Sequence, residues 1–91
     1  MPMEVIRLVR TIQLNPKFRK VALRRRPYIP ENDNETDVIA YVVPSETKTV
    51  KRLDDEIYYD YTDDEYYRVA LPDERTGFMN RLAFMEVDNN G

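Results

Sequence analysis

The chain alternates short apolar stretches with polar, proline-containing stretches, a spacing typical of β-strands joined by turns. The stretch at 37–43 is short, apolar and rich in β-branched residues, so it predicts a buried strand. The stretch at 47–53 carries lysines, which discourage further pairing, and predicts an edge strand. Further strands are predicted at 56–62, 65–71 and 78–87. We therefore expect a mainly β fold, either an antiparallel meander or a small open barrel of five to six strands.

Two N-terminal stretches fit either kind of secondary structure. Residues 3–14 form an apolar stripe as a helix, but their Val, Ile and Thr content favours a strand. Asn15 followed by Pro16 is typical of a helix start, with Asn as the N-cap and Pro at the first helical position. An α+β fold with one short helix near 16–26 is therefore the alternative.

The segments 56–62 and 65–71 predict the two arms of a hairpin around Asp63 and Asp64. This turn lacks the glycine of the usual hairpin dipeptides. Because side chains alternate along a strand, one row is expected to face the core and the other to face solvent. The inward row comprises Ile57, Tyr59, Tyr61, Tyr67, Val69 and Leu71. The outward row comprises Glu56, Tyr58, Asp60, Tyr66 and Arg68.

The C-terminal part predicts a loop and a last strand. In the loop at 72–77, Gly77 is able to take a positive φ. Alternation then places Phe78, Leu82 and Phe84 on one side of the strand, and Met79, Ala83, Met85 and Val87 on the other. The tail at 88–91 is expected to be frayed.

The length of 91 residues predicts a single domain, 1–91, with a thin hydrophobic core. Cysteine is absent, so no disulfide supplements that core, and a homo-oligomer or a place in a larger assembly is a reasonable expectation. The longest apolar run, Val38 to Val43, is too short to span a bilayer, and Arg7 and Arg10 interrupt the only candidate signal sequence. We expect a cytoplasmic protein without a membrane partner.

Charge is distributed unevenly although the net charge is only −3. Residues 1–30 contain eight basic residues and one acidic residue, whereas residues 31–91 contain six basic and sixteen acidic residues. Such asymmetry indicates two electrostatic faces, or one face that pairs with the other.

The residue types needed for most catalysis are missing. Histidine and cysteine are absent, and the only serine, Ser45, has no recognisable basic partner. The two glycines, Gly77 and Gly91, are too few and too far apart for a glycine-rich phosphate loop. We assign no catalytic residue and no cofactor, and we expect a protein that is not an enzyme.

Two acidic clusters are candidates for a metal site. In the loop 31–37, acidic residues alternate as in a calcium loop, but neither register has the glycine that the sharp turn requires. The cluster between Asp54 and Glu65 lacks a basic residue to hold a phosphate substrate, as a two-metal nuclease would need. We therefore assign no metal ligand.

The stretch from Asp54 to Tyr66 combines seven carboxylates with four tyrosines, which indicates a surface that docks on a basic protein partner. An exposed pair of Tyr58 and Tyr66 is its expected centre, although cross-strand aromatic pairing explains the same placement. The extreme form is a nucleic-acid (DNA) mimic that inhibits its target, as in small viral proteins, and the modest net charge argues against it. The candidate partner-binding residues are Asp54, Asp55, Glu56, Tyr58, Asp60, Asp63, Asp64, Glu65 and Tyr66.

The alternative is a nucleic-acid-binding domain within a larger assembly. The stretch 17–26 is rich in cations, which bind phosphate backbones through counterion release. Phe18 and Tyr28 are candidates for stacking on bases. The candidate residues are Lys17, Arg19, Lys20, Arg24, Arg25 and Arg26. The sequence leaves open whether these arginines pair with the acidic hairpin of the same chain.

Overall fold

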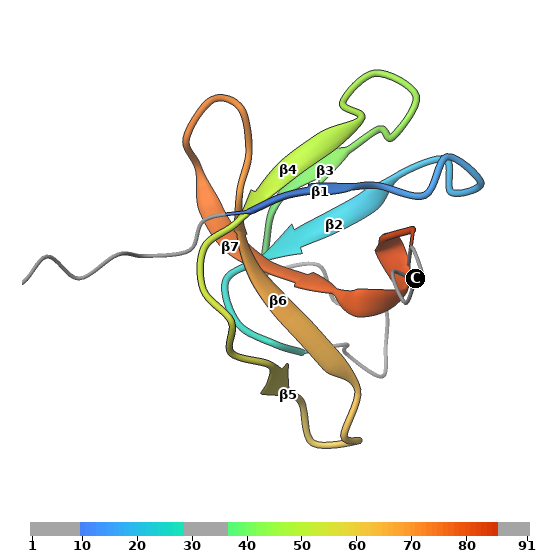
Figure 1. The fold of residues 1–91 in the computed structure, drawn as a ribbon. Helices are drawn as coiled ribbons and strands as arrows, with labels where there is room; N and C mark the ends of the chain where they lie inside the picture. Colours follow the sequence, from blue (N-terminus) through green and yellow to red (C-terminus); the bar gives the residue numbers. More distant parts are fainter. Residues whose placement is uncertain (1–9, 29–36, 86–91) are drawn as a thin grey trace, which may run out of the picture.

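The computed structural model describes residues 10–28 and 37–85, which form an open antiparallel sheet of seven strands (Figure 1). The strands are β1 (Arg10–Gln13), β2 (Val21–Arg24), β3 (Val38–Val42), β4 (Thr49–Arg52), β5 (Tyr58–Tyr59), β6 (Glu65–Ala70) and β7 (Thr76–Asn80). The helical structure in these residues is confined to the short 3-10 helix η1 (Arg81–Ala83). The predicted mainly β, antiparallel fold is confirmed, and the sheet does not close into a barrel.

The strand order across the sheet is β1-β4-β6-β7-β2-β3, with β5 paired to β6, so the topology is not a simple meander. Strand β4 pairs with both β1 and β6, and the edge position predicted for 47–53 is therefore wrong. Its Lys51 projects from the surface of the sheet and stays exposed without lying at an edge. The strand predicted at 37–43 is present as β3, but it lies at the end of this order. With a strand neighbour on one side, it is mostly half-buried and not fully buried.

The sheet curls until β1 reaches the segment that follows η1. Leu14, next to the end of β1, forms an isolated antiparallel bridge with Phe84. The Asn15 N–H donates to the Ala83 carbonyl at 2.8 Å. The curl gives the sheet an inner face, on which the main hydrophobic core lies.

The core consists of buried apolar side chains from six strands or their ends, and from η1. Its members are Leu14, Leu23, Val42, Val50, Val69, Leu71, Met79, Ala83 and Phe84. Tyr67 packs beside them, with its ring stacked on Phe84 at 5.4 Å between centroids. The Arg52 guanidinium lies over the same tyrosine ring at 3.9 Å from its centroid, a favourable cation–π geometry. The inward placement predicted for Tyr67, Val69 and Leu71 is therefore confirmed.

The opposite, outer face of β6 and β7 carries a second cluster. Alternation along the two strands places Tyr66 and Phe78 on the side away from Val69 and Met79. Tyr58 of β5 joins them and contacts the Phe78 ring edge-on at 5.0 Å between centroids. Strand β6 is therefore covered on both faces at its N-terminal end, which strict inside–outside alternation does not anticipate.

The helix considered near 16–26 is wrong. The Asn15 side chain accepts a hydrogen bond from the Lys17 N–H at 3.0 Å, as an N-cap does, but the turn at residues 16–19 does not continue. The chain enters β2 at Val21 instead, because its backbone pairs with β3 over four residues. For 3–14, the strand prediction is confirmed over β1, and residues 3–9 lie outside the described residues.

The continuous strand predicted at 78–87 is also wrong, because β7 ends at Asn80. The Asn80 side chain accepts from the Leu82 N–H at 2.8 Å and starts η1. The helical turn breaks the period of two, so Leu82 is 75% exposed while Ala83 and Phe84 are both buried. The tail predicted at 88–91 lies outside the described residues.

Gly77 has a different role from the predicted one. Its φ is not positive, and Glu74 supplies the left-handed residue of this turn with φ 75°. Gly77 lies within β7, where a Cβ atom would stand 2.6 Å from the Arg24 carbonyl oxygen and 2.9 Å from the Leu23 Cγ atom. The glycine is needed because the backbone of β2 comes too close for a side chain.

Replacing Gly77 therefore tests the packing of β7 against β2. We predict that Gly77→Ala lowers the free energy of unfolding by about 2–3 kcal/mol, because a backbone carbonyl cannot move aside cheaply. The exposed neighbour Thr76 is the control, and Thr76→Ala is expected to cost less than about 1 kcal/mol. Urea denaturation measures both. Equal, small effects would contradict the close approach of the two strands.

Candidate functional site

The predicted hairpin is present, with a shorter first arm. Tyr58 pairs with Tyr66 and Tyr59 with Glu65, and residues 60–64 form the loop. Figure 1 shows this hairpin at the end of the sheet that lies away from the turn between β3 and β4. Because β5 has two residues, the regular alternation assumed for 56–62 does not extend along that segment.

Asp60 organises the loop. Its Oδ1 atom accepts from the Thr62 N–H at 2.8 Å, the Thr62 hydroxyl at 2.7 Å and the Asp64 N–H at 3.1 Å. Its Oδ2 atom accepts from the Tyr66 hydroxyl at 3.2 Å. Asp63 has a left-handed backbone with φ 68°, and its N–H donates to the Asp60 carbonyl at 3.0 Å. Asp63 thus takes the left-handed conformation that glycine usually supplies in a tight hairpin turn, and the hydrogen bonds to the Asp60 carboxylate stabilise the loop around it.

These contacts set the protonation of both buried groups. Burial by itself raises the pKa of Asp60, but hydrogen bonds from Thr62, Asp64 and Tyr66 stabilise the charged form and bring this pKa below its ordinary value. Tyr66 is completely buried, and burial, with the nearby Asp60 charge, raises its pKa to about 12. The pair is therefore a charged carboxylate bound to a neutral phenol at neutral pH.

The exposure predicted for the hairpin side chains is wrong at five positions. Asp60 and Tyr66, predicted outward, are 7% and 0% exposed. Ile57, Tyr59 and Tyr61, predicted inward, are 39%, 55% and 60% exposed. The physical reason is the Asp60 carboxylate: it turns toward Tyr66 on the outer face and so directs the flanking side chains to solvent.

Tyr58 is also not available as an exposed binding residue. It is half-buried against Phe78, and its hydroxyl donates to the Asp54 Oδ2 atom at 2.9 Å. This hydrogen bond is the main reason why the pKa of Tyr58 lies above its ordinary value. Tyr58 and Tyr66 are cross-strand partners, as predicted, but they stabilise the sheet.

Arginines of the same chain neutralise part of the acidic stretch. Asp55 pairs with Arg10 at 3.0 Å, and Asp54 lies 3.9 Å from Arg68. Glu65 pairs with Arg81. Within the described residues, the arginines of segment 17–26 therefore form no ion pair with the acidic hairpin. The three ion pairs of this stretch use Arg10, Arg68 and Arg81 instead.

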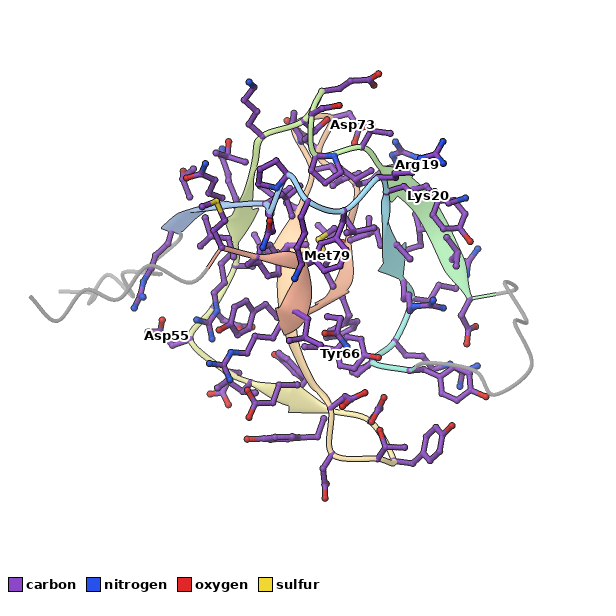
Figure 2. All side chains as sticks on the ribbon, turned by 90° about the vertical axis from the view of Figure 1, so that its right-hand side faces the viewer. Arg19, Lys20, Asp55, Tyr66, Asp73 and Met79 are labelled. Atoms are coloured by element: carbon purple, nitrogen blue, oxygen red, sulfur yellow. The ribbon has the colours of Figure 1, made fainter. Side chains whose placement is uncertain are left out.

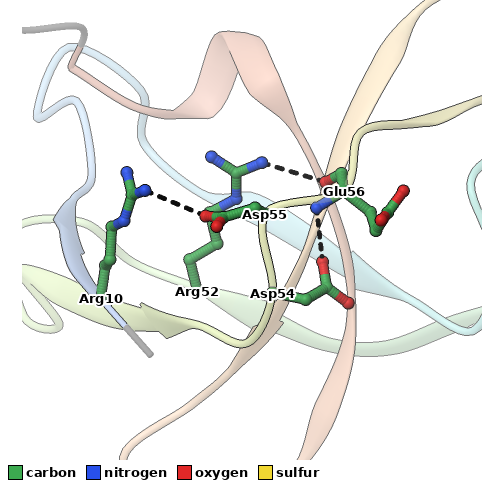
Figure 3. A network of polar contacts seen from close by, with 5 residues as sticks. All are labelled: Arg10, Arg52, Asp54, Asp55 and Glu56. Atoms are coloured by element: carbon green, nitrogen blue, oxygen red, sulfur yellow. Dashed lines mark hydrogen bonds and ion pairs between the residues drawn. The ribbon is translucent and has the colours of Figure 1, made fainter. Parts of the chain in front are cut away.

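The linker before β5 is held by the same network (Figure 3). Arg52 donates to the Glu56 carbonyl at 3.0 Å, and the Glu56 N–H donates to the Asp54 Oδ1 atom at 3.0 Å. Figure 3 shows that the Glu56 side chain points away from Arg52, so its carboxylate is not used in these contacts. Surface ion pairs of this kind contribute little stability individually, but here they fix the backbone that leads into the hairpin.

What remains outward is a set of three apolar or aromatic and three acidic side chains. Glu56, Asp63 and Asp64 are exposed and form no ion pair with another described residue. The Tyr61 ring packs against Tyr28 at 5.8 Å between centroids. We call this set the hairpin surface; its members are Glu56, Ile57, Tyr59, Tyr61, Asp63 and Asp64.

Sequence reasoning missed the three uncharged members of the hairpin surface. The signal that points to them is Asp60 followed two residues later by Thr62, because an aspartate in this spacing often accepts hydrogen bonds from the backbone and begins a turn. A turn starting at Asp60 ends the alternation there, which removes the basis for placing Tyr61 inward.

The basic segment is divided by β2. Lys17, Arg19 and Lys20 are exposed on the turn before this strand, and Figure 2 shows Arg19 and Lys20 on the side of the molecule away from Asp55. The other candidates follow or lie in the strand: Arg24 is half-buried, Arg25 is exposed, and Arg26 pairs with Asp37 at 3.1 Å. Lys20 lies over the Tyr41 ring at 4.1 Å from its centroid.

Two further properties follow from the described ranges, 10–28 and 37–85. They contain no group of three or more acidic side chains arranged to hold a metal ion. They also contain no helix with the length and apolar character needed to cross a membrane.

Removing the Asp60 charge tests its role in the hairpin. We predict that Asp60→Asn lowers the free energy of unfolding by about 1–3 kcal/mol at pH 7, since hydrogen bonds to a charged acceptor are lost. The folded pKa of Asp60 is lowered, so its contribution is complete above the unfolded pKa of about 3.9 and is lost as the pH falls through the folded pKa. The difference between wild type and variant is therefore expected to shrink below about pH 4.

Asp64→Asn is the matched control, because this neighbouring carboxylate is exposed, and we expect it to cost less than about 0.5 kcal/mol. Chemical denaturation of the three proteins between pH 7 and pH 3 provides the measurement. An Asp60→Asn deficit that is the same at both pH values would show that the charge is not the stabilising element.

Comparison of this chain with protein-family models, with curated proteins and with solved structures finds no match.

Proposed function

We propose that this chain is a non-catalytic binding protein whose hairpin surface docks on a basic surface of a protein partner. The observation that carries the proposal is the exposure of Ile57, Tyr59 and Tyr61 beside carboxylates without an ion pair in the described chain. Exposed tyrosine is typical of binding surfaces, because it offers a large contact area at a low entropic cost.

Preorganisation supports the same function. The hydrogen bonds of Asp60 hold the loop between Tyr59 and Asp64 in one conformation before any partner arrives. A surface that is already ordered loses less conformational entropy on binding, so more of its contact energy becomes affinity.

The charge of the hairpin surface favours a cationic partner. Glu56, Asp63 and Asp64 steer a basic surface toward the tyrosines, and like-charged partners are disfavoured. Imitation of a nucleic-acid backbone has less support, because the other four carboxylates of the stretch are buried or paired within the chain. An inhibitory role, a viral origin, a cytoplasmic location and a homo-oligomer or larger assembly stay predictions.

The alternative of nucleic-acid binding through 17–26 has weaker support from this geometry. Binding to a phosphate backbone depends on the number of accessible cations, whereas Arg24 is half-buried and Arg26 is engaged by Asp37. The three exposed cations before β2 keep this alternative as a prediction. Its signature would be binding that weakens steeply with salt.

The hairpin surface is tested by comparing partner recovery between immobilised variants. We predict that a double variant, Tyr59→Ala with Tyr61→Ala, retains at least tenfold less of the proteins that the wild-type chain retains. The reason is that exposed aromatic side chains dominate such interfaces. Both side chains are more than half exposed, so the fold is expected to remain intact. Recovery is measured by quantitative mass spectrometry of proteins retained from a lysate of the source cells.

Two control variants isolate the effect. Tyr41→Ala removes another partly exposed tyrosine, on β3, and Asp73→Asn removes a carboxylate in the turn before β7; both are expected to retain wild-type recovery.

A triple variant tests the charge of the hairpin surface. Combining Glu56→Gln, Asp63→Asn and Asp64→Asn is expected to weaken recovery mainly at low salt. Unchanged recovery with the double tyrosine variant would refute the proposed docking surface.

A further inference from the structure

A groove of about 340 Å³ lies between β2 and η1, and the hairpin surface does not include it, apart from Asp64 on one wall. It arises because β2 and β7 separate after one residue pair, Arg24 with Phe78. By contrast, β7 pairs with β6 over five residues. Val21 and Ala22 of β2 therefore have no paired strand on this side in the described chain. Both line the groove and are half-buried, so they are the part of β2 with which an added strand can pair.

The walls of the groove are largely apolar. Met79 and Ala83 are buried beneath it, Phe18 and Ala22 are half-buried along it, and Leu82 stands 75% exposed at its rim. Leu82 is the most exposed large apolar side chain in the described chain, and η1 holds it there by turning Ala83 and Phe84 inward. Apolar walls of this kind suit the apolar side chains of an extended peptide.

The positive charges along the groove favour peptides that carry a carboxylate. Arg24 lines it and is half-buried, and its guanidinium forms no ion pair with another described residue. A carboxylate beside this guanidinium gains a charge-assisted attraction, so the groove favours a ligand that carries one. Lys20 adds a second cation at the rim, whereas Asp64 contributes one opposing charge on the far wall.

We propose that this groove binds an extended segment of a partner protein that carries apolar side chains and a carboxylate. The segment pairs with β2 at Val21 and Ala22, its apolar side chains lie against Leu82 and Phe18, and its carboxylate pairs with the Arg24 guanidinium. This site shares only Asp64 with the hairpin surface and prefers ligands of the opposite charge. The chain would then hold two different segments at once, one basic and one acidic.

The probe is a display library of random heptapeptides panned against the full chain. We expect enrichment of peptides that contain at least one Asp or Glu and two or more apolar residues. The dissociation constant of an enriched peptide, measured by fluorescence polarisation, is expected to rise at least tenfold in Leu82→Asp and in Arg24→Gln. Leu82 is exposed, so Leu82→Asp keeps the fold, which thermal denaturation verifies for both variants.

Controls separate this site from the hairpin surface. Ile57→Asp alters the hairpin surface, and Arg75→Gln removes an exposed arginine that pairs with Asp73; both are expected to bind the peptide as wild type does. Several results would overturn the proposal: no enrichment over an unrelated target, enrichment of peptides without carboxylates, or full binding by Leu82→Asp. Self-association of the chain that Leu82→Asp abolishes would assign the groove to a second copy instead, and would also overturn it.

Discussion

The buried carboxylate of Asp60 is the interaction on which the hairpin depends. A charged group at 7% exposure is tolerated because two N–H groups and two hydroxyls donate to it. Those donors bring Thr62 and Tyr66 toward it and leave Tyr59 and Tyr61 outside. The exposed aromatic surface is therefore a direct consequence of how one buried charge is satisfied, and not of weak packing elsewhere.

Covering both faces of β6 has consequences for the whole molecule. The inner face completes the hydrophobic core through Val69, while the outer face buries Tyr66 beneath the hairpin and next to Asn80 of β7. A small sheet that is covered on both faces buries more apolar surface than a sheet covered on one face. This burial stabilises a chain that has no disulfide. The separation of β2 from β7 then leaves a groove on this sheet that Asn80 of β7 also lines.

Local signals in the sequence were sufficient for the antiparallel β class, for the hairpin around Asp63 and for the inward side chains of β6 from Tyr67 onward. They were insufficient wherever distant segments decide the outcome. The inner position of β4 depends on pairing with β1 and β6, and Asp55 meets an arginine 45 residues away. The inward placement of Tyr61 failed for a local reason, since a turn beginning at Asp60 ends the strand on which alternation relies.

Selective nitration of tyrosines tests the central claim most directly, because tetranitromethane modifies exposed phenols in their ionised form. The account predicts that Tyr59 and Tyr61 are nitrated in the folded protein while Tyr66, buried and with its pKa raised to about 12, stays unmodified until the chain unfolds. Peptide mapping by mass spectrometry distinguishes the three sites. Nitration of Tyr66 as fast as that of Tyr59 would show that the carboxylate of Asp60 does not hold this ring inside, and would contradict the account.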